Sequence, residues 1–197
     1  MDFQVRALLT TLTEDYNRIS MHGVRRELLL AQARSIGIPA EEVWIPSKAS
    51  NEIYQEQTTK VVMKWKEKGG VSTIAFGDLF LEDIRAYREK FLGSLGFKCM
   101  FPLWKKDTSE LAQNFIKTGF KAILCTVDPR KLDPKFCGRE FDESLLSELP
   151  KTVDPCGENG EFHTFVYDGP IFKKEKFNVT VGEIVERESF YFADLCL

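Results

Sequence analysis

The first half of this 197-residue chain alternates between short apolar stretches and longer amphipathic stretches, and this alternation restricts the fold more than any other feature. The apolar stretches predict strands at residues 5–12, 42–45 and 71–76. The spacing of apolar side chains between them predicts helices at residues 23–36, 51–68 and 81–95. Strands that alternate with helices build parallel sheets with right-handed crossovers. The pattern therefore predicts an α/β fold in which the first and third strands are buried in a parallel sheet.

The pattern changes near Gly96, and the second half is expected to form a smaller α+β domain. We expect strands at residues 99–103, 121–127, 162–167, 177–185 and 190–195, the last two joined by a hairpin at 187–189. We expect helices at residues 107–118, where Asp-Thr-Ser-Glu resembles a capping box, and at 141–149. No linker or low-complexity segment separates the two patterns. The sequence therefore predicts two domains, residues 1–97 and 98–197.

Composition and charge place the chain among cytoplasmic globular proteins. Hydrophobic residues make up 43% of the sequence and charged residues 29%, which is typical of such proteins. The net charge of −3 gives no electrostatic reason to expect nucleic acid as a partner. Without an apolar run of about 18 residues or a signal peptide we expect no membrane span and no secretion. The five cysteines are scattered without a CxxC pair, which favours reduced thiols, although a zinc site of Cys137, Cys156 and His163 is an alternative.

Residues 154–168 are the part of the chain richest in chemically useful side chains. Two glycines allow the backbone to turn tightly or to approach a ligand closely. Glu158, Glu161 and His163 add two carboxylates and an imidazole just before and within a predicted strand. On a strand, Glu161 and His163 would share a face because they are two residues apart. The alternative is a glycine-rich hairpin whose polar side chains are solvated.

The carboxyl ends of the first and third predicted strands are two further candidate sites, because ligands of open parallel sheets bind there. After the third strand, Asp78 and Asp83 could hold a metal ion or a ribose. Arg85 and Arg88 are three residues apart on the predicted helix, so their guanidinium groups could clamp an anion. The alternative is ordinary helix capping by acidic residues together with solvated arginines.

The other histidine, His22, lies after the first strand and near the predicted start of the first helix. It could face a ligand there, and the alternatives are a helix cap or a surface position. Trp104 is interpreted as an aromatic residue at the interface of the two domains. The signatures GxxxxGK[ST], GxGxxG, HExxH and GxSxG do not occur in the sequence, so the commonest phosphate, metalloprotease and serine-hydrolase motifs are excluded.

Several separated motifs occur in order along the chain. They are Leu-Thr-Thr-Leu-Thr-Glu at 9–14, Ser-Met-His-Gly-Val-Arg at 20–25, Ala-Phe-Gly-Asp-Leu-Phe-Leu-Glu-Asp-Ile-Arg at 75–85, Phe-Pro-Leu-Trp at 101–104, Cys-Gly-Glu-Asn-Gly-Glu-Phe-His-Thr at 156–164 and Asp-Gly-Pro at 168–170. Together they closely resemble the diphthine–ammonia ligase-like ATP pyrophosphatases, which are adenine nucleotide alpha hydrolase-like proteins. The resemblance extends over essentially the whole chain.

The resemblance implies a fold, a reaction and partners. The implied fold is a HUP-like, Rossmann-like domain that binds ATP, followed by a family-specific substrate domain. The implied reaction is attack of a substrate carboxylate on the α-phosphate of ATP, which gives an acyl-adenylate, followed by amide formation with ammonia. ATP and Mg²⁺ would be the cofactors, and the carboxylate would be a small molecule or be carried by a protein. The residues at 9–25 are most similar to the bacterial branch of the family, so the identity of the acyl substrate stays open. A homo-oligomer is also possible.

The resemblance and the chemistry of the side chains together assign roles to individual residues. The expected catalytic residues, which would bind ammonium and deprotonate it, are Glu158, Glu161 and His163. The expected nucleotide-binding residues are Thr10, Thr11, Gly77, Asp78 and Arg85, with Asp78 also the expected metal ligand. The expected substrate-binding residues are His22, Asp83, Arg88, Gly157, Asn159, Gly160 and Thr164.

One part of the family pattern is missing from this sequence. The chain begins where the family's second strand begins, so the first strand and its Ser-Gly-Gly-Lys-Asp-Ser phosphate loop are absent. In the HUP fold that strand lies between the second and the fourth, and we expect its loss to leave unpaired backbone groups on both neighbours unless they close up or another chain fills the gap. We therefore expect an N-terminally truncated HUP-like domain with impaired ATP chemistry. The alternative is a non-catalytic nucleotide- or metabolite-binding module that has lost its phosphate loop.

Overall fold

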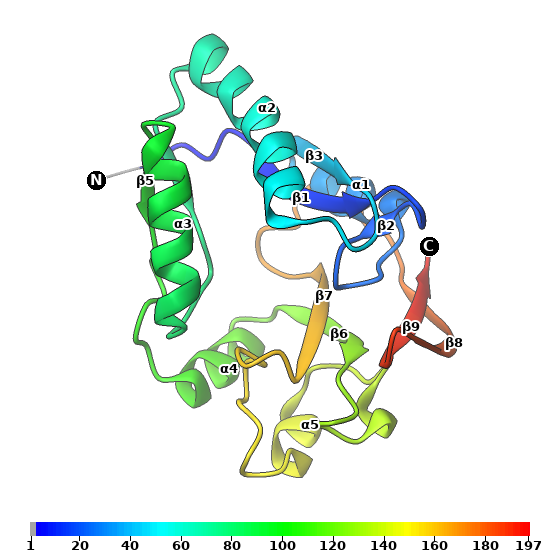
Figure 1. Ribbon diagram of the computed structural model, residues 1–197. Coiled ribbons are helices and arrows are strands. Elements are labelled where there is room, and N and C mark those ends of the chain that lie inside the picture. The colour runs from blue at the N-terminus through cyan, green and yellow to red at the C-terminus, as the bar shows by residue number, and fades with distance from the viewer. Residues whose placement is uncertain (1–2) are drawn as a thin grey trace.

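A computed structural model describes residues 3–197 of the chain (Figure 1). Its helices are α1 (Arg26–Ile36), α2 (Asn51–Gly69), α3 (Glu82–Ser94), α4 (Thr108–Lys117) and α5 (Glu143–Glu148), with a short 3-10 helix at Pro134–Phe136. Its strands are β1 (Leu8–Thr13), β2 (Arg18–Ile19), β3 (Ala40–Ile45), β4 (Thr73–Ala75), β5 (Lys98–Met100), β6 (Lys121–Val127), β7 (Phe162–Asp168), β8 (Thr180–Arg187) and β9 (Phe190–Cys196).

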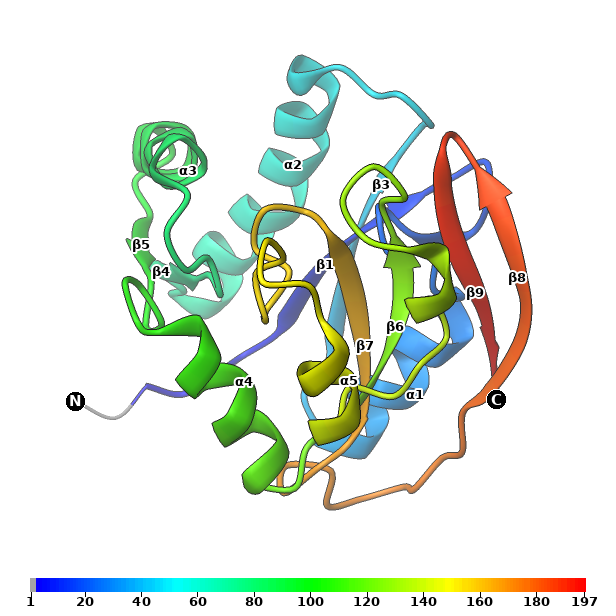
Figure 2. The same cartoon turned by 90° about the horizontal axis from the view of Figure 1, so that it is seen from below.

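The strands form three sheets, with the orders β2-β1-β3, β4-β5 and β7-β6-β9-β8. β1 is parallel to β3 and β4 is parallel to β5, whereas the four-stranded sheet is antiparallel. Figures 1 and 2 show the four-stranded sheet between an N-terminal layer, made of β1, β2, β3 and α1, and the helices α4 and α5. The predicted mixture of helices with parallel strand pairs is confirmed, but the parallel strands lie in two separate sheets.

Local sequence signals explain the start of α2 and the end of α1. The Ser50 hydroxyl accepts a hydrogen bond from the first turn of α2. α1 ends at Gly37, whose left-handed backbone (φ 80°) costs glycine little. α1 begins at Arg26, later than predicted, because Gly23 (φ 66°) and Arg25 (ψ 140°) lie outside the helical region. No helix within residues 3–197 combines the length and apolar character that a membrane crossing requires.

The predicted burial of the first and third strands of the chain is wrong. In β1 only Leu12 is buried, and Leu9 keeps 41% of its surface exposed. No residue of β4 is buried. β1 and β4 do not pair, and between them lies a narrow apolar cavity of about 20 Å³, lined in part by Leu9 and Ile74. β2 pairs with β1 only at Leu12 and Thr13, and no strand within residues 3–197 pairs with the rest of that edge or joins it to β4, so the side chains expected in a core stay partly exposed.

The main hydrophobic core surrounds β6, the strand predicted at the same residues. Every residue of β6 after Lys121 is buried. Leu28 of α1 belongs to this core, as do Leu145 of α5 and Leu195 of β9. A smaller cluster in the first half packs Val62 of α2 against α3. The second half of the chain therefore supplies most of the core, and the N-terminal layer packs onto it.

Capping and turn signals in the second half act as predicted. Asp107 accepts a hydrogen bond from the Glu110 N–H at 2.8 Å and caps α4. β8 and β9 are joined at Glu188 and Ser189, both with left-handed backbones (φ 50° and 65°), as in a type I′ hairpin. β8 begins at Thr180, three residues later than expected, and β5 is shorter than the predicted strand at 99–103. The short strand β2 was not predicted, because two residues carry no periodicity.

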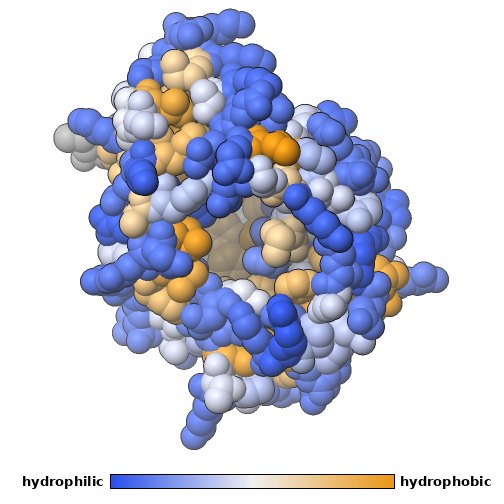
Figure 3. Space-filling view, viewed as in Figure 1, coloured by the Kyte–Doolittle hydropathy of each residue, from blue (hydrophilic) through white to orange (hydrophobic). Residues whose placement is uncertain are grey.

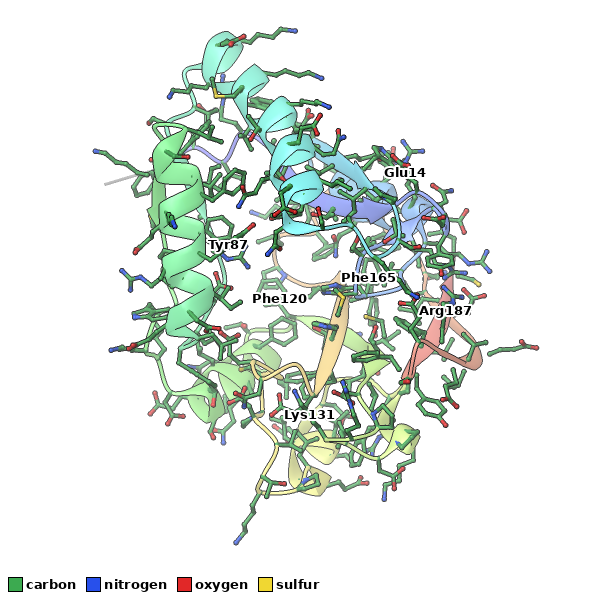
Figure 4. All side chains as sticks on the ribbon, in the orientation of Figure 1. Glu14, Tyr87, Phe120, Lys131, Phe165 and Arg187 are labelled. Atoms are coloured by element: carbon green, nitrogen blue, oxygen red, sulfur yellow. The ribbon has the colours of Figure 1, made fainter. Side chains whose placement is uncertain are left out.

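The face of the molecule seen in Figure 1 is hollowed at its centre. Figure 3 shows this hollow between the region of α2 and α3 and the lower half of the molecule. In Figure 4, Tyr87 of α3 and Phe120, just before β6, flank the same region. The hollow therefore lies where the two halves of the chain face each other.

Candidate functional site

The two histidines of the chain lie against each other where the N-terminal layer meets the four-stranded sheet. The ring centroids of His22 and His163 are 4.6 Å apart, with the ring planes inclined by 31°. His163 is the second residue of β7, and His22 lies in the turn between β2 and α1. The Thr126 hydroxyl of β6 lies 3.0 and 2.9 Å from the carbonyl oxygens of Met21 and His22, which holds this turn against the sheet. Folding thus joins a predicted catalytic residue to a predicted substrate-binding residue.

Burial lowers the pKa of both imidazoles. Desolvation lowers the pKa of His22, against the opposing effect of the Ser20 carbonyl 3.2 Å from Nδ1. Burial, and secondarily the neighbouring His22, lowers the pKa of His163 to about 4. Because a carbonyl oxygen only accepts hydrogen bonds, Nδ1 of His22 carries the proton of that ring. His163 is therefore a neutral group that can accept a proton, in a place where two positive charges are disfavoured.

Glu158 connects the two stretches that the sequence singled out. Its Oε1 accepts hydrogen bonds from the backbone N–H groups of Leu79 and Phe80, at 2.7 and 3.3 Å. These N–H groups lie just before α3, at the position where the sequence predicted an anion site. The anion that occupies them in the folded chain is the Glu158 carboxylate itself. This contact ties the 154–168 loop to the segment after β4.

Glu161 is buried, with 3% of its surface exposed, immediately before β7. Its Oε1 accepts hydrogen bonds from the Asp154 N–H at 3.0 Å and the Asn159 side-chain amide at 3.1 Å. Its Oε2 is buried and has no hydrogen-bond partner within residues 3–197. A buried carboxylate oxygen without a hydrogen-bond donor lowers the free energy of unfolding. A ligand that is cationic or donates a hydrogen bond to this atom would therefore stabilise the fold.

The glycines of the loop let it fold back on β7. Gly157 and Gly160 both have left-handed backbones (φ 71° and 77°). A side chain at Gly157 would place its Cβ 2.7 Å from the carbonyl oxygen of Phe162. The predicted use of glycine for a tight turn is therefore confirmed at this position. Thr164 lies further along β7, opposite Leu124 of β6.

The arginines after β4 are engaged by carboxylates and aromatic rings of the chain. Arg88 pairs with Asp78: Nη2 donates a hydrogen bond to Oδ1 at 3.0 Å, whereas Nε lies 2.8 Å from Oδ2 without the geometry of a hydrogen bond. Arg85 pairs with Glu89 at 2.9 Å. Its guanidinium carbon lies 4.7 Å from the ring centroid of Trp104. Trp104 therefore packs against α3, and the two arginines do not form an open clamp in this conformation.

The side chains present do not fit a magnesium site at Asp78. Both of its carboxylate oxygens face Arg88, which neutralises them. Asp83, the other expected acidic ligand, is exposed. In the described part of the chain no three His, Cys, Asp or Glu side chains converge as metal ligands would, and this includes the zinc alternative. The described residues therefore offer no complete set of protein ligands for a metal ion.

Thr10 and Thr11 lie apart from these contacts. They are in the middle of β1, paired with Glu42 and Val43 of β3, and not in the loop at the carboxyl end of β1. Gly77 is exposed in the segment that Glu158 holds. The structure thus unites the 154–168 loop with the segment after β4 and with His22, while the two threonines stand outside this group.

Sequence reasoning missed two contributors to the arrangement. Thr126 anchors the His22 turn, and the signal that marks it is a hydroxyl side chain in an otherwise apolar strand. Asp194 of β9 binds both Arg18 and Arg25, which fixes the β2–α1 turn to the last strand. No local sequence pattern predicts that contact, because its partners lie near opposite ends of the chain.

Comparisons with known proteins identify the relatives of this chain. Residues 107–195 match the family model described as the diphthamide synthase C-terminal domain. The chain is 35% identical over 133 residues to the diphthine–ammonia ligase of Bos taurus, and 34% identical over 133 residues to that of Homo sapiens, covering 65% of this chain and 49% of each relative. It is 38% identical over 99 residues to the diphthine–ammonia ligase of Schizosaccharomyces pombe, covering 48% of this chain and 16% of that protein.

The chain spans about half the length of the first two relatives. The matched family model covers β6, β7, β8 and β9, and with them His163 and the 154–168 loop. The resemblance predicted from the motifs is confirmed: this chain is similar to diphthine–ammonia ligases, and its residues 107–195 match the model of the diphthamide synthase C-terminal domain.

Proposed function

We propose that the chain serves an ATP-dependent, amide-forming ligase of the diphthine–ammonia ligase type. The similarity to ligases of that name supports the reaction class. The observation that carries the proposal is the buried Oε2 of Glu161, which has no partner in residues 3–197 and lies two residues before the neutral His163. An ammonium ion would supply the missing donor, and the imidazole would accept the proton that ammonia must lose.

The proposed reaction has two steps. A substrate carboxylate attacks the α-phosphorus of ATP, the α–β phosphoanhydride bond breaks, and pyrophosphate leaves. Ammonia then attacks the acyl carbon of the adenylate, AMP leaves with the bonding electron pair, and one proton passes from nitrogen to a base. We assign that base to His163, which is uncharged at neutral pH.

The residues of the two stretches divide between nucleotide and substrate in this proposal. Glu158 couples them, because it holds Leu79 and Phe80 beside the segment assigned to the nucleotide. The nucleotide side comprises Thr10, Thr11, Gly77, Asp78 and Arg85. The substrate side comprises His22, Asp83, Arg88, Gly157, Asn159, Gly160 and Thr164.

We further propose that the two parallel strand pairs are the halves of one HUP-type sheet. β1 and β4 face each other across the apolar cavity without pairing. Thr58 of α2 lines this cavity, and its buried hydroxyl has no partner within residues 3–197. A strand between β1 and β4 would join the pairs into a single sheet. Residues 1–97 would then be the nucleotide-binding part and 98–197 the substrate-binding part.

A non-catalytic nucleotide- or metabolite-binding module is the second candidate. The observation that favours it is that Glu158 occupies the N–H groups of Leu79 and Phe80, which could otherwise face a phosphate. Such a module would bind ATP without cleaving it.

Release of pyrophosphate distinguishes the two candidates. The purified chain is incubated with ATP, ammonium chloride and a protein that carries diphthine, and pyrophosphate is measured with and without each component. The ligase proposal predicts release that requires the carboxylate substrate. Binding of ATP without release would establish the module, and the absence of both would overturn both candidates.

A further inference from the structure

A polar recess of about 330 Å³ lies at the carboxyl end of β1. Its walls come from the turn after β1 and from the start of α1. The lining residues are Tyr16, Asn17, Arg18, Arg25, Arg26 and Glu27. In open parallel sheets this end of a strand is where ligands bind. The recess therefore combines a favourable position with an unusual density of arginine.

Two of the arginines are fixed by one carboxylate. Arg25 binds both oxygens of Asp194, at 2.9 Å from Nε and 2.6 Å from Nη2, and Arg18 adds a contact of 2.9 Å. Asp194 thus pre-orients two guanidinium groups while neutralising one positive charge. The nearest acid to Nη1 of Arg25 is Glu27, at 3.7 Å, beyond hydrogen-bond distance.

Two further arginines keep donors that the described chain does not use. The Nε–H of Arg26 donates a hydrogen bond to Glu42 at 2.8 Å, while its two Nη atoms have no acceptor among residues 3–197. Arg187 lies 4.7 Å above the ring of Tyr16 and has no ion pair in that same range of residues. A guanidinium group carries five N–H donors in a planar fork that matches phosphate oxygens.

The charge around the recess favours an anion. Three arginines line the recess and Arg187 lies beside it on the ring of Tyr16, whereas the nearby carboxylates that pair with them are Asp194, Glu27 and Glu42. The side chains of Arg18, Arg25 and Arg26 are 20%, 38% and 40% exposed, so they are partly desolvated. α1 starts at this recess, and the side chain of its N-cap residue, Arg25, does not cap it. The positive end of the helix dipole therefore adds to the field of the guanidinium groups.

We propose that this recess binds a phosphate group. A purely structural role, in which Asp194 of β9 holds the N-terminal layer by ion pairs, explains the positions of Arg18 and Arg25. It does not explain why Arg26 and Arg187 keep unused N–H donors. The recess borders the turn that carries His22, because its lining residues Arg18 and Arg25 lie on either side of that residue in the chain. Figure 4 places Glu14 and Arg187 at one edge of the molecule, away from Tyr87 and Phe120, which flank the central hollow.

The test is titration of the ¹⁵N-labelled chain with inorganic phosphate and with diphosphate, at constant ionic strength set by chloride. The expected result is a saturable shift of backbone amide signals in residues 16–27. Arg26→Gln and Arg187→Gln each remove a phosphate contact and are expected to weaken binding about tenfold. Arg34→Gln is the matched control, because Arg34 is also on α1 but pairs with Glu175 away from the recess.

Three results would overturn the proposal. The first is no saturable shift with either anion. The second is equal weakening by Arg34→Gln, which would mean that surface charge alone attracts the anion. The third is a shift confined to Leu79 and Phe80, which would place the phosphate in the proposed nucleotide site. Circular dichroism of each variant separates lost binding from lost folding, and Arg187→Gln keeps the test valid if Arg26→Gln unfolds.

Discussion

At the scale of single residues, the environment of His163 decides what this imidazole can do. The ring packs on His22, and burial of both rings makes the charged form unfavourable. The neighbouring carboxylate of Glu161 is more fully buried than either ring, and it turns toward the Asp154–Asn159 loop. The chain therefore holds a neutral base and a carboxylate near each other without joining them in an ion pair.

The depressed pKa of His163 predicts a loss of stability in acid. The folded-state pKa is about 4 and the unfolded value is 6.5, so the unfolded chain binds the proton more tightly. The contribution of this group is complete above pH 6.5 and is lost as the pH falls toward 4. A shift of this size corresponds to about 3 kcal/mol at most. Urea unfolding at pH 7 and pH 4.5 measures it.

His163→Asn is the control for that measurement, because asparagine does not titrate in this range. The loss of unfolding free energy between the two pH values is expected to be smaller in the variant than in the original chain. An equal loss in both would show that other groups cause the acid sensitivity.

At the scale of elements, the loop at 154–168 acts as a clasp between the halves of the chain. Glu158 reaches Leu79 and Phe80, while the loop itself is shaped by left-handed glycines. Sequence periodicity predicted the strand β7 that follows and the helix α5 that precedes the loop, because these signals are local. It could not predict the contact of Glu158 with Leu79 and Phe80. The local sequence around a loop carboxylate does not show whether the carboxylate is solvated or accepts hydrogen bonds from a distant part of the chain.

Glu158→Ala is expected to loosen the segment after β4. Two backbone donors lose a charged acceptor, which costs about 2 kcal/mol. Hydrogen exchange at Leu79 and Phe80 should become faster, whereas the amides of α4 should not change. Asp107→Ala is the complementary variant, since it uncaps Glu110 and should affect α4 alone. Unchanged exchange at Leu79 in Glu158→Ala would contradict the clasp.

Two glycines allow the cost of a steric clash to be separated from the cost of a left-handed backbone. Gly157 and Gly119 have similar angles (φ 71° and 85°), but only a side chain at Gly157 meets a neighbour, the Phe162 carbonyl oxygen. Gly119→Ala is expected to cost about 1 kcal/mol and Gly157→Ala clearly more. Thermal unfolding of both variants compares them, and equal costs would mean that the loop moves away from β7.

At the scale of the whole molecule, the sequence predicted the classes of the elements better than their assembly. The parallel pairs β1–β3 and β4–β5 follow from the alternation of strands and helices. Their separation into two sheets, and with it the exposure of Leu9, depends on contacts that no local pattern encodes. The same holds for His22 and His163, whose pairing requires the N-terminal layer to dock on β6 and β7 through Thr126.

The most direct test of the proposed function follows ammonia itself. The chain is incubated with ATP, a diphthine-carrying protein and ¹⁵N-labelled ammonium, and label in the product amide is measured by mass spectrometry, alongside ATP binding. We predict labelled amide for the original chain, and loss of label with unchanged ATP binding for Glu161→Gln and for His163→Asn. Equal labelling by Glu161→Gln, or loss of ATP binding together with the label, would contradict the assignment of ammonia to the Glu161–His163 loop.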